Sequence, residues 1–422
     1  MKRVAIVGGG WAGLACGVEL AHAGRATTIF ESARQVGGRA RGLDWKGIHL
    51  DNGQHLMVGA YRETLRLMQR LRTEHLLERR PLDLRVPGFH LSLPRLPEPL
   101  HLVVGLLRAR GLSLADKLAA VRFIEVLRTN QFRLDEDLPV DRFLHDRRQS
   151  AQLVDRLWGP ICIAALNTPL DRASAQVFCN VLRDSLMGPR SDSDLLINRG
   201  PLGRLFPEAA ADYIQALGGE VRTATKVERI QRQAECFRLD GPDADFDAVV
   251  IATHPSRVPV LLAGLPECVA LARRISRLAW QPILTLWLRF EHSLPFPFPM
   301  LGLGGGQAPW AFERNDLAPG LVAILVSSEG PHLARAHADL RDEYLRLLAQ
   351  ELGPLPPLLD WICIVEKRAT FACTPNLDRP GNATPVAGLF LAGDYTAGRY
   401  PATLEAAVRS GVECARLILE PP

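Results

Sequence analysis

The amino-acid sequence predicts an α/β protein in which a Rossmann-like domain is interleaved with a mixed-sheet substrate-binding domain and a helical subdomain. Three observations predict this class: a glycine turn between strand and helix signals near the N-terminus, helical periodicity in the middle of the chain, and apolar strand patterns in its second half. We expect the Rossmann-like domain over residues 1–80, 200–255 and 365–422, the substrate-binding domain over 81–112 and 256–364, and the helical subdomain over 113–199.

The N-terminal segment has the order strand, glycine turn, helix, strand and acidic residue. Gly8, Gly10 and Gly13 fit G-x-G-x-x-G. In that pattern the first glycine permits a tight turn, the second lets a pyrophosphate approach the backbone, and the third lets helix and strand pack closely. The helix N-terminus adds free N–H groups and a partial positive charge. Glu31 follows after about 20 residues, where a carboxylate accepts hydrogen bonds from a ribose. The chain is therefore predicted to bind an adenine dinucleotide. Three neighbouring residues are expected to contact the same cofactor: Trp11, Ala12 and Ser32.

The composition is that of an ordinary globular enzyme. With 422 residues, of which 47% are hydrophobic and 23% charged, the chain is long enough for two or three domains and a large core. Its net charge of +4 is too small and too scattered to indicate nucleic-acid binding. The eight cysteines show neither a C-x-x-C pair nor ligand spacing, so we expect no metal site and reduced thiols in a cytoplasmic protein.

The first residues could be mistaken for a signal peptide, because Lys2 and Arg3 precede an apolar run from Val4 to Val18. Cleavage there would discard the phosphate turn, which argues against that interpretation. No apolar stretch reaches about 18 residues with the character of a membrane span. We therefore expect that the protein does not cross a membrane.

Apolar periodicity predicts the elements between the two ends of the chain. Residues 113–187 have the three- and four-residue spacing of helices, and another helix is expected after Gly200, through Ile214, to Gly218. Strands are expected at 220–227, 247–253, 283–290 and 321–327, and loops at 93–99 and 295–299.

A second strong signal lies near the C-terminus. Residues 388–395 form a predicted buried strand that ends in Gly393 and Asp394, and residues 400–405 open a helix that runs to Gly411. Pro401 suits the start of a helix, because its missing N–H is no loss there.

Gly37, Gly38 and Arg39 follow shortly after Glu31, and this arrangement resembles the second turn of the FAD-dependent amine oxidase and carotenoid oxidoreductase superfamily. The resemblance implies FAD rather than NAD, a binding domain of the GR2 type, and contact of Gly38 and Arg39 with the pyrophosphate. It also implies cofactor contacts in the middle and C-terminal segments, at Val227, Ala252, Gly393, Asp394, Ala402, Thr403 and Leu404. The C-terminal helix would stabilise negative charge on reduced flavin with its free N–H groups.

Two further blocks resemble the squalene-associated FAD enzymes, the family of the bacterial hydroxysqualene dehydroxylases: residues 50–61 (LDNGQHLMVGAY) and 366–371 (EKRATF). Tyr395 departs from the pattern, in which a tryptophan is expected after the Gly-Asp pair. The resemblance implies removal of an allylic hydroxyl from hydroxysqualene to give squalene, in hopanoid and squalene biosynthesis. Reduced FAD would deliver hydride from N5 to the carbon that loses the hydroxyl, and the protein would supply orientation and electrostatics.

The leaving hydroxyl needs a proton donor, and two segments expected near the flavin offer candidates. His55 titrates near neutrality and is a candidate for catalysis or substrate contact, with a structural hydrogen-bonded histidine as the alternative. Lys367 is the second catalytic candidate, although a Glu-Lys-Arg run is also typical of a salt-bridged strand edge. Gly53 and Gln54, beside His55, are expected to approach the flavin ring, as the resemblance implies.

A hydrophobic isoprenoid substrate implies a membrane surface as partner. At about 0.8 kcal/mol per CH₂, a hydrocarbon of roughly thirty carbons costs on the order of 20 kcal/mol to hold in water, so it comes from a bilayer and returns to one. Residues 100–107 are apolar and are flanked by Arg95, Arg108 and Arg110, which fits either an interfacial helix or a core helix. Residues 294–303 are a weaker candidate for such a contact. We expect a cytoplasmic protein associated peripherally with the inner face of the membrane.

Other functions fit parts of the pattern. A carotenoid or isoprenoid desaturase would share the fold but run the flavin in the oxidising direction, and the block at 51–55 argues for the dehydroxylase instead. An amine oxidase needs a cage of aromatic side chains, whereas the aromatic content is 6%. A lipid-binding escort without flavin would not need the intact glycine turn and Glu31. Only one dinucleotide fingerprint is present, so a partner reductase and free reduced flavin are both open as the source of electrons.

Overall fold

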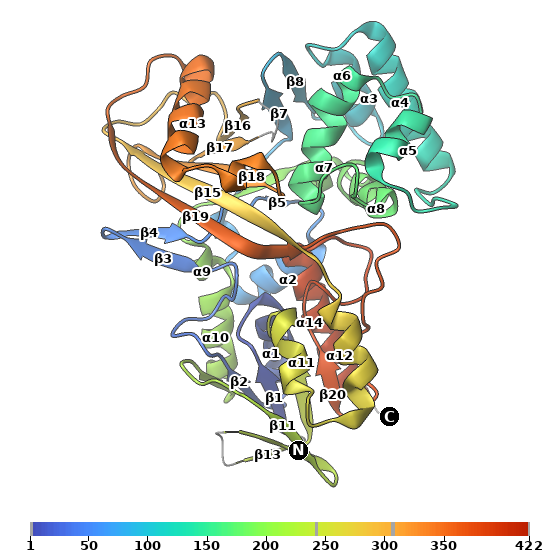
Figure 1. The fold of residues 1–422 in the computed structure, drawn as a ribbon, viewed down its shortest axis with the longest axis vertical. Coiled ribbons are helices and arrows are strands. Elements are labelled where there is room, and N and C mark those ends of the chain that lie inside the picture. The colour runs from blue at the N-terminus through green and yellow to red at the C-terminus, as the bar shows by residue number, and fades with distance from the viewer. Residues whose placement is uncertain (1–2, 241–243, 305–308, 421–422) are drawn as a thin grey trace.

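The computed structural model of this protein describes residues 3–240, 244–304 and 309–420. Figure 1 shows two lobes: a lower lobe built on a parallel sheet, and an upper lobe in which an antiparallel sheet stands beside a group of helices.

The parallel sheet is assembled from distant parts of the chain. Its strands, in spatial order, are β10 (Glu220–Arg222), β2 (Ala26–Phe30), β1 (Arg3–Val7), β14 (Ala248–Ile251) and β20 (Leu389–Leu391). Every neighbouring pair is parallel, and Ile6 of β1 lies between Ile29 and Val250. The predicted Rossmann-like fold with interleaved segments is confirmed.

Both faces of this sheet are covered, because the side chains of its apolar strands alternate between them. Ile6 and Val250 pack on one face against helices, and Ala5 and Val249 pack on the other. The first face carries α1 (Trp11–His22), α10 (Pro207–Ala216) and α14 (Leu404–Leu419). The second carries α11 (Val258–Leu261), α12 (Val269–Ser276) and a small sheet of β11 (Ile230–Gln233), β12 (Cys236–Leu239) and β13 (Asp245–Phe246).

The upper lobe contains the predicted strands of the substrate-binding domain. Its sheet has the order β16 (Met300–Gly302), β17 (Trp310–Glu313), β18 (Leu321–Ser327), β15 (Trp280–Phe290) and β19 (Leu358–Phe371), with antiparallel pairing throughout. Helix α13 (His337–Leu352) packs on the face that includes Leu284, Leu286 and Leu288, while Trp287 faces the other way. In Figure 1, β19 descends from this sheet to the junction with the lower lobe.

A group of helices lies beside that sheet. The apolar spacing over 113–187 predicts helices in this part of the chain. They are α3 (Leu100–Arg108), α4 (Leu114–Thr129), α5 (Val140–Asp146), α6 (Ala151–Leu153), a π-helical turn (Val154–Trp158), α7 (Gly159–Leu166) and α8 (Ala175–Leu186). Ser113 starts α4 with a capping box, in which its Oγ accepts from the backbone N–H of Asp116 at 3.1 Å.

Short strands and helices connect these units. They are β3 (Gly42–Trp45), β4 (Ile48–Asp51), β5 (Met57–Val58), α2 (Arg62–Leu71), β6 (Leu77–Arg80), β7 (Asp83–Val86), β8 (Phe89–Ser92), β9 (Leu195–Asn198) and α9 (Leu202–Leu205).

Several observed contacts cross the predicted domain boundaries. Strand β9, predicted in the helical subdomain, pairs with β5 and β6 and buries all four of its residues. Helices α11 and α12, predicted in the substrate-binding domain, pack on the parallel sheet because their apolar side chains complete its second face. Helix α3, also predicted in the substrate-binding domain, packs on α4 as well as on β8.

Several element boundaries differ from the prediction, among them those of the strand after Gly219 and of the C-terminal helix. The strand expected at 220–227 ends at Arg222, because the chain turns at Ala224, whose φ is +50°. The C-terminal helix expected to end at Gly411 continues to Leu419. Across the described ranges, no helix combines the length and the apolar character that crossing a bilayer requires.

Candidate active site

The first glycine turn is formed by a close approach of backbone segments. Gly8 has a φ of +117°, and a Cβ added there would lie 2.5 Å from the Ala252 carbonyl oxygen. A Cβ added at Gly13 would lie 2.0 Å from the Gly8 carbonyl oxygen. At Gly10 an added Cβ would meet only the Cα of Gly38, at 3.8 Å. The first and third glycines therefore close the turn, and the second leaves its surface open to a ligand.

The two predicted pyrophosphate turns lie against each other. Gly37 donates its N–H to the Gly9 carbonyl oxygen at 2.8 Å, and a parallel bridge joins Gly10 to Gly37. Gly38, the residue before Arg39, has a φ of +65°, in the left-handed region that favours glycine. Backbone without side chains thus faces the α1 N-terminus from both turns, as a bound pyrophosphate requires.

Glu31 is fixed at the end of β2. Its carboxylate accepts from the N–H of Gly9 and the N–H of Ala33, both at 2.8 Å, and from the Ser32 hydroxyl at 3.2 Å. A carboxylate has about four acceptor positions, so capacity remains for a ribose hydroxyl. This donor and acceptor set fits a dinucleotide.

Arg39 joins the N-terminal and C-terminal motifs. Its Nη2 donates to the Asp394 carboxylate at 2.6 Å, and its Nη1 donates to the Ala369 carbonyl oxygen at 2.6 Å. Asp394 is buried at the turn after β20. The structure therefore brings together two predicted cofactor residues that are far apart in the sequence.

The turn after β20 is anchored on α14. Gly393 donates its N–H to the Ser410 hydroxyl at 2.9 Å. Tyr395 is fully buried, and a Cβ added at Gly393 would lie 2.5 Å from its ring. Burial raises the pKa of the Tyr395 phenol. The residue that replaces the expected tryptophan thus packs in the core beneath the turn.

The N-terminus of α14 follows from this turn. Thr403 caps it, because its Oγ1 accepts from the Ala406 N–H at 3.1 Å. Ala402 and Leu404 lie half-buried on either side. Glu405 points back to α2, where its carboxylate accepts from the N–H of Thr64 at 2.9 Å. The first turn of α14 is consequently held in place from both ends.

The side chains of two predicted cofactor contacts, Trp11 and Val227, are buried. The Trp11 ring is buried, and its centroid lies 4.8 Å from that of Phe206 in a stacked arrangement. Val227 is also buried, among the apolar side chains that cover the second face of the sheet. The Trp11 indole N–H donates to the Ala40 carbonyl oxygen, at the end of the second glycine turn, at 3.4 Å.

His55 is half-buried at the end of the predicted flavin-facing segment. Its Nδ1 lies 2.9 Å from the Gly53 carbonyl oxygen, which can only accept, so Nδ1 carries the proton. Burial, opposed by Asp51, lowers the pKa of His55. The neutral ring therefore exposes Nε2 as a hydrogen-bond acceptor, and the predicted role of proton donor is not favoured.

Lys367 lies on the opposite face of the upper sheet from His55. A Cβ added at Gly53 would lie 3.6 Å from Thr285 Oγ1, so Thr285 faces the segment that carries His55. Leu284 precedes Thr285 in β15 and pairs with Val365, and these residues line a cavity of about 420 Å³ together with Lys367. Because successive strand residues alternate in direction, Lys367 and His55, the two separate candidates, lie on opposite faces of the sheet and do not share one site.

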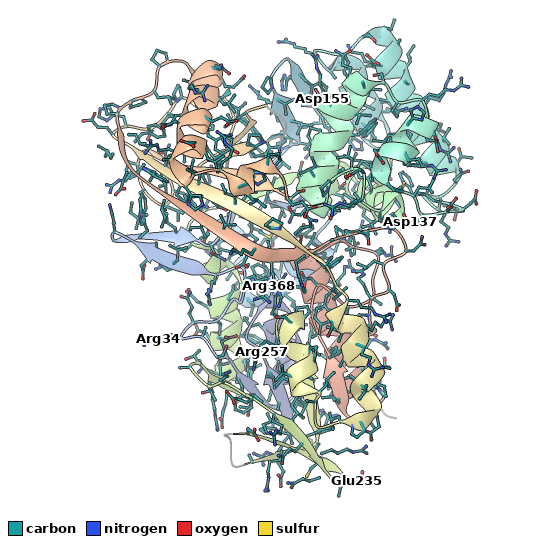
Figure 2. All side chains as sticks on the ribbon, in the orientation of Figure 1. Arg34, Asp137, Asp155, Glu235, Arg257 and Arg368 are labelled. Atoms are coloured by element: carbon teal, nitrogen blue, oxygen red, sulfur yellow. The ribbon has the colours of Figure 1, made fainter. Side chains whose placement is uncertain are left out.

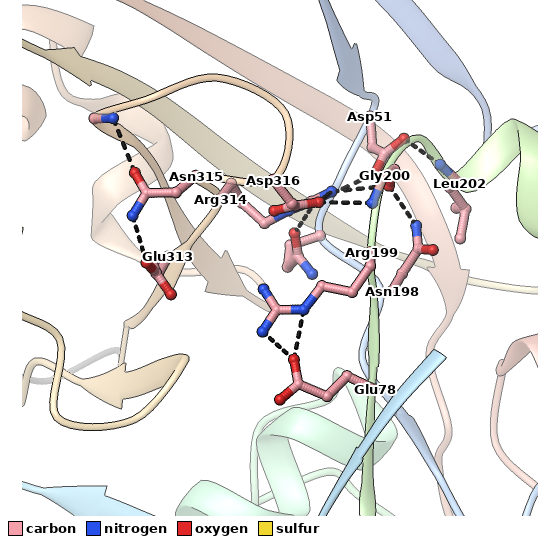
Figure 3. A network of polar contacts seen from close by, with 12 residues as sticks. Asp51, Glu78, Asn198, Arg199, Gly200, Leu202, Glu313, Arg314, Asn315 and Asp316 are labelled. Atoms are coloured by element: carbon pink, nitrogen blue, oxygen red, sulfur yellow. Dashed lines mark hydrogen bonds and ion pairs between the residues drawn. The ribbon is translucent and has the colours of Figure 1, made fainter. Parts of the chain in front are cut away.

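Two residues near the site carry no sequence signal that singled them out. Arg314 is buried and donates to Asp51 and Gln54, and Figure 3 shows it between Asp51 and Asp316 in the network. The ring centroid of His254 lies 4.5 Å from that of Trp280, and burial, followed by Arg39 and Arg368, lowers the pKa of His254 to about 4. Figure 2 shows Arg368 at the junction of the two lobes. A histidine directly after a buried strand could have indicated the second of these positions.

Comparisons with known proteins agree with this geometry. The family described as flavin containing amine oxidoreductase matches residues 11–419. A hydroxysqualene dehydroxylase of Rhodopseudomonas palustris is 30% identical, over 99% of this chain and 98% of that protein. One of Sinorhizobium fredii is 28% identical over the same shares. The crystal structure of an oxidoreductase from Methanosarcina mazei has a TM-score of 0.74 at 16% identity, covering 98% of this chain and 100% of the other.

The predicted superfamily and its cofactor are therefore confirmed, and the individual contact residues remain predictions. The family match extends over nearly the whole chain, and the two glycine turns, Glu31 and the turn after β20 fit the group that it implies. This chain belongs to the family of flavin containing amine oxidoreductases and is an FAD-dependent oxidoreductase.

Proposed function

We propose that this protein catalyses the reductive dehydroxylation of hydroxysqualene to squalene, in hopanoid and squalene biosynthesis. The observation that carries the proposal is similarity along the full length to two proteins named hydroxysqualene dehydroxylase. The Asp51–His55 block supports it, because it presents buried polar groups where the two lobes meet. The reaction converts an alcohol to a hydrocarbon and water, and reduced FAD supplies the hydride and the proton that this requires.

Different groups of residues would bind different parts of the cofactor. The glycine turns and α1 would bind the pyrophosphate, Glu31 the ribose, and the α14 N-terminus the flavin ring. The proposed set is Gly8, Gly10, Trp11, Ala12, Gly13, Glu31, Ser32, Gly38, Arg39, Gly53, Gln54, Val227, Ala252, Gly393, Asp394, Ala402, Thr403 and Leu404.

We assign His55 to substrate contact. With its Nδ1 proton held by Gly53, the neutral ring offers Nε2 to the hydroxyl hydrogen of the substrate. This contact would orient the carbon–oxygen bond for displacement without moving a proton. Lys367 is not retained in the proposed site, because it lines the cavity on the far face of the sheet.

A bilayer is the proposed source of the substrate, which places the protein at the inner face of the membrane. Four leucines of α3 and α4 are unusually exposed: Leu100 (51%), Leu107 (41%), Leu114 (68%) and Leu118 (55%). We call them the α3–α4 apolar surface. Exposed arginines of the same region are suited to anionic headgroups: Arg95, Arg108, Arg110 and Arg122. The weaker candidate at 294–303 does not form such a surface, because Leu294, Met300 and Leu303 are buried.

Anaerobic mixing of dithionite-reduced holoprotein with hydroxysqualene tests the proposed reaction. We expect the flavin to reoxidise while squalene accumulates in equal amount, because each turnover uses one reduced flavin. A reduced flavin that persists, with no squalene formed, would overturn the proposal. Reduction of the oxidised protein by added amines would indicate an amine oxidase instead.

A further inference from the structure

Arg314 is the centre of a buried polar network between the lobes. It follows β17, its side chain is 1% exposed, and Figure 3 shows it among acceptors from three segments. Nη1 lies 2.6 Å from Gln54 Oε1 and 3.3 Å from Asp51 Oδ2. Nη2 lies 3.1 Å from the Gly200 carbonyl oxygen and 3.1 Å from Asp316 Oδ2, and Nε lies 3.0 Å from Asp316 Oδ1.

These contacts use the whole donor capacity of the guanidinium. Arginine has five N–H donors and no acceptor, and the five distances above account for one acceptor each. Arg314 therefore has no donor left for a ligand. Asp51 extends the network, because its Oδ1 accepts from the Leu202 N–H at 2.9 Å.

The network determines which way the Gln54 amide points. A guanidinium only donates, so the atom that faces Arg314 must be the amide oxygen, and the NH₂ group must point away from it. Gln54 is 7% exposed, and within the described ranges its Nε2 makes no hydrogen bond to the chain. The Nε2 atom keeps access to solvent, so this donor is open to a ligand.

Gln54 and His55 then offer complementary groups from adjacent positions. Gln54 presents N–H donors, and His55 presents Nε2 as an acceptor. A hydroxyl group both accepts and donates one hydrogen bond, so this pair matches an alcohol better than a hydrocarbon.

We propose that Arg314 is a positioning residue that fixes the Gln54 amide as the donor to the substrate hydroxyl, next to the acceptor of His55. The inference rests on the proposed function for the identity of the alcohol. It concerns how the alcohol is recognised, and it does not depend on turnover.

The test measures the preference of the oxidised holoprotein for alcohol over hydrocarbon. Hydroxysqualene and squalene are titrated separately from identical phosphatidylcholine vesicles, and binding is followed by the change in the flavin absorption spectrum. Oxidised flavin cannot supply hydride, so binding is read without reaction. We expect the parent to bind the alcohol about tenfold more tightly, the value of one good hydrogen bond.

Two variants remove the proposed contact from different sides. Gln54→Met keeps the size of the side chain and removes its donors, and Arg314→Lys keeps the charge between Asp51 and Asp316 but cannot satisfy five acceptors. Each variant should bind both ligands about equally, and the double variant should lose nothing further. Arg199→Lys is the matched control, since Arg199 lies beside Gly200 and, within the described ranges, its side chain donates to Glu78 alone.

The outcomes separate this inference from a structural role and from the proposed function. If the role of Arg314 were merely structural, its replacement would weaken the binding of both ligands alike and lower the thermal midpoint. The ratio of the two affinities would then stay the same. The inference would be overturned if the parent showed no preference for the alcohol or if either variant kept the parental preference. It would also be overturned if the losses of the two single variants added up in the double variant. Retained alcohol preference in the parent without squalene formation would instead refute the proposed reaction alone.

Discussion

The protonation of single side chains determines what the proposed site can do. His55 donates from Nδ1 to the Gly53 carbonyl oxygen, and burial lowers its pKa, so the neutral form dominates near pH 7. Arg314 remains charged and fully hydrogen-bonded. The site therefore combines the charged guanidinium of Arg314, whose N–H donors are all occupied, with the neutral imidazole of His55, which can accept a hydrogen bond.

Replacement of His55 by alanine should slow flavin reoxidation by hydroxysqualene about ten- to hundredfold, the cost of one lost hydrogen bond at the reacting group. Bound FAD should remain, because the hydrogen bond of the His55 ring to the described part of the chain stays within its own segment. The parent should lose activity as the pH falls through the lowered pKa of His55, below about 6.5, since protonation removes the acceptor. Stopped-flow traces across pH give both results.

The control for this change is His49→Ala, because His49 pairs with Asp44 on an exposed hairpin. It should keep the parental rate and pH profile. Equal rates for His55→Ala and the parent would remove His55 from the mechanism, and a retained loss of activity at low pH would assign that loss to another group.

Helix packing sets the relative position of the two cofactor-binding helices. A Cβ added at Gly411 of α14 would lie 2.1 Å from the Ala12 carbonyl oxygen of α1. In the proposed site the N-terminal turns of both helices would hold FAD, so their spacing would be part of that site. Glycine at this position allows the close contact and costs helix propensity of about 1 kcal/mol.

Gly411→Ala should therefore destabilise the protein, although the same change stabilises an isolated helix. We expect a loss of about 1–3 kcal/mol in the free energy of unfolding from overpacking, and weaker FAD binding because both helix N-termini shift. Urea unfolding and FAD titration measure the two effects.

Gly381→Ala provides the comparison, because an added Cβ there meets no atom within 4 Å. Its stability should stay within about 0.5 kcal/mol of the parent. A Gly411→Ala variant as stable as this control would show that α1 and α14 separate freely.

At the scale of the whole molecule, the two lobes differ in what they present to their surroundings. The lower lobe carries the cofactor motifs, and the upper lobe carries the α3–α4 apolar surface at its helical end (Figure 1). In the proposed function an isoprenoid substrate enters from a bilayer there, while the glycine turns of the lower lobe remain in water.

Replacement of Leu114 and Leu118 by glutamine should weaken binding to vesicles of phosphatidylglycerol and phosphatidylcholine. Each leucine contributes about 1.5–3 kcal/mol when fully buried, so a five- to hundredfold loss in affinity is expected from partial insertion. Cosedimentation measures it, and higher salt should weaken binding further because the arginines contribute.

The matched variant is Leu217→Gln, which removes a leucine of similar exposure, 50%, at the end of α10 in the lower lobe. It should bind vesicles as the parent does. Unchanged binding of the double variant would show that the membrane contacts another surface.

The sequence predicted those features whose signal is local. Most strands and turns of the cofactor domain have their own pattern, so these elements could be anticipated from motifs, whereas their order in the parallel sheet was not predicted. The Arg314 network could not, because its partners come from positions 51, 54, 200 and 316 and share no spacing. Strand alternation places Val365 and Lys367 on one face but does not tell which face meets the cofactor. Likewise, helical spacing at Leu114 and Leu118 does not distinguish a buried side from an exposed one.

The interleaved order of the parallel sheet has a consequence for synthesis. Strand β1 pairs with β14, more than two hundred residues later, and β14 pairs with β20 near the end of the chain. A nascent chain emerging from the ribosome can fold local hairpins and helices first, but Arg39 has no Asp394 to pair with until the last segment has emerged. In the proposed site, cofactor capture therefore follows the emergence of β20 and Asp394, and the unfinished sheet must be kept from pairing with other chains until then.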